Sequence, residues 1–143
     1  MNYLCDTNVF LAAAIGQHAN HAQAARWFSD LGDIDTAAFC RATQTSFLRL
    51  LTRKIADPFQ PLTNRQAWQT YDALFRDDAI IFLPEPADLE IHWRRLANSD
   101  TASPKVWMDA YLAAFAIAAK VRLVTLDADF RNYEKHGLAL HLL

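Results

Sequence analysis

The sequence predicts an α/β fold, a three-layer α/β/α sandwich with a mostly parallel central sheet. Short apolar runs alternate with segments of helical periodicity, and this alternation is typical of right-handed βαβ crossovers that cover both faces of a sheet. The chain has 143 residues, of which 52% are apolar. That is enough to bury one compact core, so we expect a single domain over residues 1–143.

The first third of the chain contains two strand-like runs and one helix signal. An apolar strand starts at Tyr3 and leads into Asp6. Asn20, with a glutamine three positions later, has the spacing of a helix N-terminus, and apolar residues recur behind it with helical period. We expect this helix to end near Gly32 and a short strand to follow at residues 35–39.

The next helix has two faces of different chemistry. Its apolar side contains Phe47, and Gln44 lies close to that side, so we expect Gln44 to point toward the interior. The opposite face carries arginines at multiples of four positions, which we call the basic ladder: Arg41, Arg49 and Arg53. We expect the helix to end at the Asp57–Pro58 dipeptide, because proline cannot continue a helix.

The remaining elements are predicted from caps and apolar runs. A capping box at residues 63–66 indicates the start of a helix that continues through Phe75. The elements expected after it are, in order, a strand at residues 80–83, a helix capped by Asp88, an apolar helix at 105–120, a strand that leads to Asp127, and an edge strand at 138–142.

Two of the predicted strands end on aspartates, Asp6 and Asp127, that lie near opposite ends of the chain. If these strands are neighbours in a parallel sheet, their carboxylates share the crevice in which open α/β sheets bind ligands. Asp109, on the apolar helix before the second strand, supplies a third carboxylate. Such a cluster repels itself unless a cation intervenes, so the sequence predicts a site for a hard divalent ion such as Mg²⁺.

Polar residues beside these aspartates extend the predicted site. Asp129 is a further candidate ligand, and Asn8 and Thr125 are candidates for an outer shell that holds water. A divalent ion there would acidify a bound water and neutralise charge on a phosphorus, which is the chemistry that cuts phosphodiester bonds. Aspartates at strand ends are also ordinary turn and helix-cap residues, so that interpretation stays open for each of them.

Composition excludes several classes of function. A net charge of −2 gives the chain no overall attraction for nucleic acid or a membrane surface, so any polyanion must meet a local patch or a cation. Two cysteines, Cys5 and Cys40, argue against a disulfide framework and suit a reducing compartment. The chain shows no basic leader or signal segment, and its longest apolar stretch is shorter than the roughly 20 residues that cross a bilayer. We therefore expect a cytoplasmic protein without membrane contact.

Four segments resemble the motifs of PIN-domain nucleases, and the resemblance is closest to the VapC-type toxins of bacterial toxin–antitoxin pairs. In chain order the segments are CDTNVFL at residues 5–11, TQTSFLR at 43–49, WMDAYLAAFA at 107–116 and TLDADF at 125–130. The resemblance implies a PIN-like fold and a Mg²⁺- or Mn²⁺-dependent endoribonuclease that acts on tRNA or ribosomal RNA. It also implies a homodimer and an inhibitory VapB-type antitoxin that presses a peptide into the active-site groove.

Carried over to this chain, the resemblance assigns metal binding to Asp6, Asp109 and Asp127, with Asp129 assisting. One position departs from the pattern, because PIN nucleases usually have glutamate where this chain has Gln44. An amide can accept a hydrogen bond from a metal-bound water but adds no negative charge, so we expect Gln44 to position water. The departure leaves open whether one ion or two are bound, and whether the chain is a degenerate PIN domain that binds RNA or a partner without cutting.

Two further interpretations compete with these. The basic ladder is either a track for RNA phosphates or an ordinary solvated helix face. A phosphatase or receiver-type protein with Asp6 as its nucleophile is a weaker alternative, since haloacid-type phosphatases carry a second aspartate where this chain has Asn8.

Overall fold

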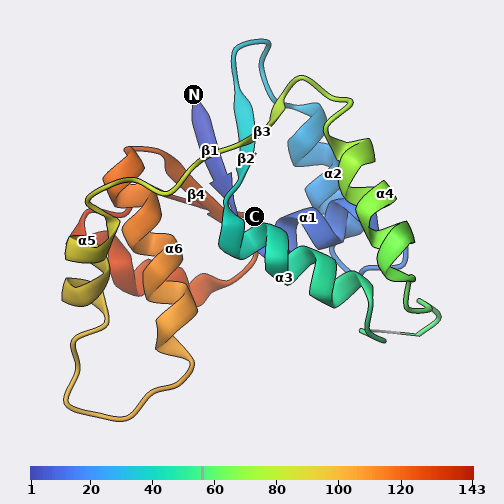
Figure 1. Cartoon of the computed structure of the whole chain (residues 1–143). Helices are drawn as coiled ribbons and strands as arrows, with labels where there is room; N and C mark the ends of the chain where they lie inside the picture. The colour runs from blue at the N-terminus through green and yellow to red at the C-terminus, as the bar shows by residue number, and fades with distance from the viewer. Residues whose placement is uncertain (56) are drawn as a thin grey trace.

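Five parallel strands form the centre of the computed structural model, which describes residues 1–55 and 57–143 (Figure 1). The strand order is β3-β2-β1-β4-β5, and every neighbouring pair is parallel. The strands are β1 (Asn2–Cys5), β2 (Thr36–Phe39), β3 (Ile80–Phe82), β4 (Arg122–Thr125) and β5 (Leu140–Leu142). The predicted parallel sheet and the place of the last strand at its edge are both confirmed.

Helices cover both faces of this sheet. In Figure 1, α5 and α6 lie on one side of the strands and α1, α2 and α4 on the other. The helices of the described residues are α1 (Thr7–Ala14), α2 (His21–Ser29), α3 (Arg41–Leu51), α4 (Asn64–Leu74), α5 (Leu89–Leu96), α6 (Val106–Ala119) and the 3₁₀ helix η1 (Ala128–His136).

A separate hydrophobic core fills each side of the sheet. Successive side chains of a strand point to opposite faces, so β1 and β4 contribute to both cores. Cys5 and Val124 pack among residues of α1, α3 and α4, whereas Leu4 and Leu123 pack among residues of α5, α6 and η1. The three-layer α/β/α architecture predicted from the sequence is therefore confirmed.

The order of the strands reverses at β1. The chain extends the sheet through β2 and β3 on one side of β1 and through β4 and β5 on the other. The backbone N–H of Asp6 donates to the carbonyl of Val124 at 2.9 Å, which holds the first residue after β1 against β4. Residues that follow β1 and β4 therefore open onto one crevice at a topological switch point, where α/β sheets bind ligands.

Two helices differ from the sequence prediction, one because it was not predicted and the other in where it ends. Helix α1 was not predicted, because its four consecutive buried residues, Val9 to Ala12, leave no polar stripe to reveal the helical period. Helix α3 ends at Leu51 and not at Asp57–Pro58. The N–H of Leu62 donates to the Leu51 carbonyl at 2.9 Å, so a returning segment satisfies the end of the helix.

The predicted N-cap residues stand at the starts of three helices, but only one of them makes its capping hydrogen bonds. The capping box of α4 is confirmed, with Gln66 N–H donating to Thr63 Oγ1 at 3.2 Å and Thr63 N–H donating to Gln66 Oε1 at 2.9 Å. Asn20 and Asp88 stand at the N-cap positions of α2 and α5 but make no capping hydrogen bond. Their ψ angles, 19° and 10°, are far from the extended conformation that aims a side chain at the helix N–H groups.

Three further features can be compared with the sequence prediction: the burial of Gln44, the state of the two cysteines, and the length of the apolar helices. Gln44 is buried, as predicted from its place on α3. Cys5 and Cys40 are buried free thiols. Within residues 1–55 and 57–143, no helix has the length and apolar character needed to cross a bilayer.

Candidate active site

Asp6 lies between the end of β1 and the start of α1, where its carboxylate is held from the side of β4. Its Oδ2 accepts a hydrogen bond of 2.7 Å from the Thr125 hydroxyl. The carboxylate makes no side-chain capping hydrogen bond to α1, although Asp6 occupies the N-cap position. The backbone N–H of Thr7, the first residue of α1, lowers the pKa of the Asp6 carboxylate, so the cap interpretation accounts for this aspartate only in part.

A small hydrogen-bond network joins the turn after β1 to the end of β4. The Thr125 hydroxyl also accepts from the N–H of Asp127 at 3.0 Å and from Asn8 Nδ2 at 3.4 Å. Asn8 Oδ1 in turn accepts from the N–H of Leu126 at 3.3 Å. Thr125 is fully buried, so these bonds rigidly connect the two segments that carry Asp6 and Asp127.

Asp127 and Asp129 follow β4 at the start of η1. Asp127 Oδ1 accepts from the N–H of Asp129 at 2.9 Å, so this residue does act as a helix cap. Asp129 is exposed, and its Oδ2 lies 3.3 Å from the ammonium of Lys105. For Asp127 the cap interpretation and the ligand interpretation are compatible, because the capping bond from the Asp129 N–H uses only one carboxylate oxygen.

The three predicted carboxylates lie within each other's electric field. Burial raises the pKa of Asp6, the Thr125 hydrogen bond lowers it, and repulsion by Asp109 and Asp127 raises it again. Asp109 lies in the first turn of α6, and its pKa is raised by burial and then by the charges of Asp127 and Asp129, while Lys105 lowers it. The sheet therefore brings together acids that are more than 100 positions apart in the sequence.

This crevice attracts positive charge. The pKa of Lys105 is raised first by its hydrogen bond to Asp129 and then by the charges of Asp129, Asp127 and Asp109. The sequence analysis missed Lys105, although its position one helical turn before Asp109 was a usable signal. The ammonium of Lys105 therefore supplies a positive charge at the edge of the crevice.

The donor set of the crevice fits a hard divalent cation. Carboxylate, amide and hydroxyl oxygens are what Mg²⁺ and Mn²⁺ prefer, and Mg²⁺ commonly uses one or two protein carboxylates while it keeps several waters. Among residues 1–55 and 57–143, no three His, Cys, Asp or Glu side chains already surround one ion position. Metal ligation by Asp6, Asp109, Asp127 and Asp129 therefore stays a prediction.

Gln44 lies in a different set of contacts. Its Oε1 accepts a hydrogen bond from the Arg41 guanidinium. Burial raises the pKa of the nearby Tyr71 phenol, and the Gln44 side chain acts to lower it. The hydrogen bonds of the described residues do not join Gln44 to any of the three aspartates of the crevice. Its predicted role in positioning water stays a prediction.

The basic ladder is exposed along α3 and just beyond its end. The guanidinium of Arg41 lies 4.8 Å above the Phe82 ring in a cation–π contact. In the described part of the chain, none of the three arginines forms an ion pair with a carboxylate. No carboxylate of the described residues neutralises them, although Arg41 also donates to Gln44 Oε1, and whether they bind RNA phosphates stays a prediction.

Comparisons with known proteins agree with this geometry. The PIN domain family matches residues 3–136. Ribonuclease VapC41 of Mycobacterium tuberculosis is 46% identical over 144 residues, which cover 98% of this chain and 97% of that protein. Solved structures share the fold at low identity. VapBC-1 from nontypeable Haemophilus influenzae aligns with a TM-score of 0.70 at 16% identity, covering 99% of this chain and 98% of that one.

A second solved complex, VapBC2 from Rickettsia felis bound to a DNA fragment from their promoter, aligns with a TM-score of 0.69 at 15% identity. It covers 99% of this chain and 98% of that chain. The family match spans nearly the whole sequence and includes each aspartate of the crevice. This chain belongs to the PIN domain family.

Proposed function

We propose that this chain is a metal-dependent endoribonuclease of the VapC type, the toxin component of a toxin–antitoxin pair. It hydrolyses phosphodiester bonds of RNA, with tRNA or ribosomal RNA as its target. The observation that supports the proposal is the placement of Asp6 and Asp127 directly after neighbouring strands at the switch point of the sheet, with Asp109 near enough for its charge to raise the pKa of Asp6. Identity to a ribonuclease over almost the full length of both chains supports it.

The residues of the crevice have distinct tasks in this proposal. Asp6, Asp109 and Asp127, with Asp129 assisting, would hold one Mg²⁺ or Mn²⁺, which supplies an acidified water and neutralises charge on the phosphate. The Thr125 hydroxyl orients Asp6 and favours its charged form, because a donated hydrogen bond stabilises a carboxylate. The arginines of the basic ladder contact phosphates along the RNA.

Cleavage assays on purified protein test this function. The chain should cut RNA in Mg²⁺ or Mn²⁺ and stop in a chelator, and Asp6→Asn should lose cleavage while it stays folded. Asp72→Asn, at an exposed acid on α4, is a matched control that should cut like the native chain. Cutting that persists without metal would refute the proposal.

A non-cutting RNA- or partner-binding module is the second candidate function. It is favoured by the neutral Gln44, whose amide oxygen is engaged by Arg41. If the native chain binds RNA without cutting it and Gln44→Glu creates metal-dependent cleavage, this second function is the correct one.

The partners proposed for the chain are RNA, a VapB-type antitoxin and a second copy of the chain. Two of the solved structures that share its fold are VapBC proteins. Expression of the chain alone should arrest growth, and either Asp6→Asn or co-expression of the antitoxin should relieve the arrest. Light scattering of the purified chain tests the homodimer, which a monomeric mass would exclude.

A further inference from the structure

A groove of about 690 Å³ runs between α3 and α6, beside the acidic crevice. It is open along its length and has walls of different chemistry. One wall is formed by Arg41, Ser46 and Arg49 of α3, and the other by Trp107, Met108 and Tyr111 of α6.

The groove adjoins the crevice through α6. Trp107 and Met108 immediately precede Asp109 in the first turn of that helix, so the apolar wall and the carboxylate share one turn. On the other side, α3 begins directly after β2, the neighbour of β1 in the sheet. The groove and the acidic crevice therefore share the first turn of α6.

The α3 wall is complementary to a polyanion. Arg41 and Arg49 are exposed, lie eight residues apart, which is about 12 Å along a helix, and form no ion pair within the described part of the chain. The acid that lines the groove, Glu85, accepts a hydrogen bond of 2.8 Å from the Tyr111 hydroxyl. This bond orients the Glu85 carboxylate but leaves its charge, so the groove lining carries two cations and one anion in a chain whose net charge is −2.

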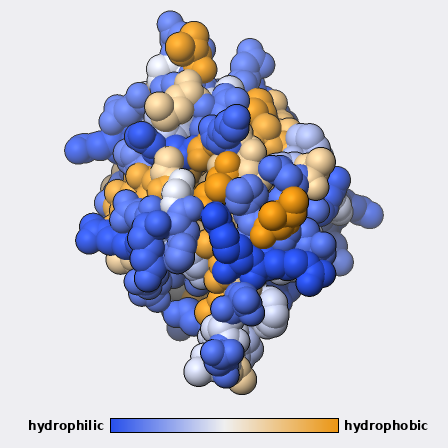
Figure 2. All heavy atoms as spheres, turned by 90° about the vertical axis from the view of Figure 1, so that its left-hand side faces the viewer, coloured by the Kyte–Doolittle hydropathy of each residue, from blue (hydrophilic) through white to orange (hydrophobic). Residues whose placement is uncertain are grey.

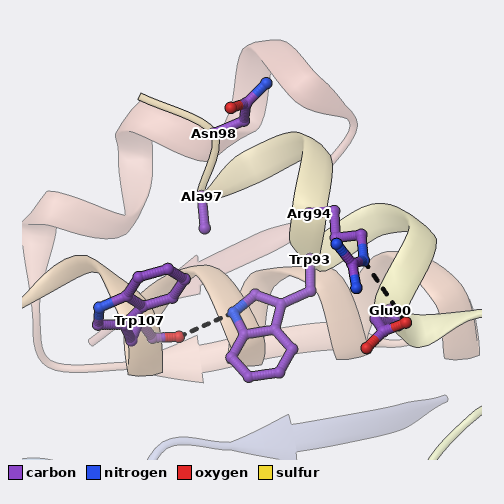
Figure 3. Close-up of a pocket in the computed structure, with 6 residues that line it drawn as sticks. All are labelled: Glu90, Trp93, Arg94, Ala97, Asn98 and Trp107. Atoms are coloured by element: carbon purple, nitrogen blue, oxygen red, sulfur yellow. Dashed lines mark hydrogen bonds and ion pairs between the residues drawn. The ribbon is translucent and has the colours of Figure 1, made fainter. Parts of the chain in front are cut away.

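The α6 wall presents an aromatic ring that is held in place. Trp107 is 60% exposed and Met108 46% exposed, which is unusual for large apolar side chains. Trp93 supports this turn from α5: its indole N–H donates to the Trp107 carbonyl at 3.0 Å, and the two rings meet edge to face (Figure 3). Figure 2 views this side of the molecule, where apolar side chains reach the surface among hydrophilic ones.

We propose that the groove between α3 and α6 binds an unpaired RNA nucleotide next to the scissile phosphate. Its base stacks on Trp107, and its phosphates meet Arg49 and Arg41. Every base has a face that stacks on an aromatic ring, and guanidinium groups track the backbone, so this pairing of walls is suited to single-stranded RNA. The inference rests on the proposed ribonuclease function and names a subsite of the same site.

RNA binding without cleavage provides the test. All variants are made in the Asp6→Asn background, and binding of a labelled, unstructured RNA oligonucleotide is followed by fluorescence anisotropy. Trp107→Ala should weaken binding roughly 5- to 150-fold, the range of one lost base–aromatic stack. Trp107→Phe should retain most of the affinity, and Arg49→Gln should weaken binding and reduce its dependence on salt.

Matched controls lie on α4. Trp68 is 49% exposed there, and Arg65 is exposed one turn earlier. Neither residue lines the groove, although Trp68 shares a separate hollow with Arg49, so Trp68→Ala and Arg65→Gln remove the same groups from outside the groove lining. Both should bind RNA like the parent. An oligonucleotide in which one base is replaced by an abasic residue should bind the parent weakly and lose its sensitivity to Trp107→Ala, because the stacking base is gone.

Three results would overturn the inference. The first is an affinity for RNA that Trp107→Ala leaves unchanged, and the second is an equal loss of affinity in the α4 controls. The third is a Trp107→Ala variant that binds RNA normally but no longer binds the antitoxin, which would make the groove a protein-docking surface. If the native chain cuts RNA while Trp107→Ala binds normally, the inference alone fails. If the native chain does not cut but binding still depends on Trp107, the ribonuclease function alone fails.

Discussion

Asp6→Asn should make the metal-free protein more stable and the metal-loaded protein less stable than the native chain. The Thr125 hydroxyl donates to Asp6 Oδ2 at 2.7 Å, and an asparagine oxygen can accept the same bond. Exchanging a charged for a neutral acceptor there costs about 1 kcal/mol. Removing the charge of Asp6 stabilises the metal-free fold by more than this cost, because burial and the charges of Asp109 and Asp127 together raise the pKa of Asp6 despite that bond.

The size of the effect follows from these opposing contributions. Repulsion between like charges near a protein surface is worth a few kcal/mol at most, so the net gain without metal is on the order of 1 kcal/mol. For a chain of this length that raises Tm by roughly 3–5 °C. Metal at about 100 times its Kd should stabilise the native chain by about 2.7 kcal/mol, or roughly 10 °C, and the variant much less.

The effect has a defined pH dependence. A carboxyl whose pKa is raised in the folded state destabilises the fold once it ionises, and this penalty is absent below its unfolded pKa. The advantage of Asp6→Asn should therefore be full near neutral pH and shrink as the pH falls toward about 4, the ordinary aspartate range.

Thermal unfolding scans of both proteins in EDTA and in excess Mn²⁺, repeated across this pH range, measure these differences. Asp72→Asn is the control, with no reversal expected between the two conditions. If Asp6→Asn is less stable than the native chain in EDTA, or gains as much from Mn²⁺, then Asp6 is a structural residue and the reasoning is wrong.

Three other substitutions probe the same crevice. Lys105→Gln should tighten Mn²⁺ binding measured by calorimetry, because it removes a cation that competes for the acids, and weaker binding would contradict this. Gln44→Glu should leave metal binding at one ion per chain, because Arg41 already donates to this side chain and would neutralise the new carboxylate. Binding of two ions per chain would contradict this. Thr125→Val should lower the free energy of unfolding in urea by about 1–3 kcal/mol, because valine leaves Asp6 and the Asp127 N–H without their buried hydrogen-bond partner. Thr125→Ser, which keeps the hydroxyl, should retain most of the native stability.

The sequence was sufficient to predict the parallel sheet, because buried strands and capped amphipathic helices alternate along the chain. It also indicated that Gln44 faces inward, since that depends on helical periodicity alone. It did not predict α1, whose residues are apolar in succession and carry no periodic signal. Asn20 and Asp88 take the predicted N-cap positions but make no capping hydrogen bond, because residue type does not determine the backbone angles that such a bond needs.

The acidic crevice was foreseen as a meeting of strand ends, but its internal contacts were not. Whether Asp127 caps η1 or faces a ligand depends on which carboxylate oxygen meets the Asp129 N–H, and sequence holds no such information. The contact of Arg41 with Gln44 and the groove beside α6 arise from packing between elements that are far apart in the chain. Spacing rules describe neighbours on one helix and do not reach across two.

The Thr125 hydroxyl donates to the carboxylate of Asp6, so the crevice closes only after both of these residues have been synthesised. A nascent chain on the ribosome, or one terminated early, lacks β4 and the acids that follow it, and cannot assemble the site. For a protein proposed to harm the cell that makes it, late assembly means that incomplete translation products are innocuous.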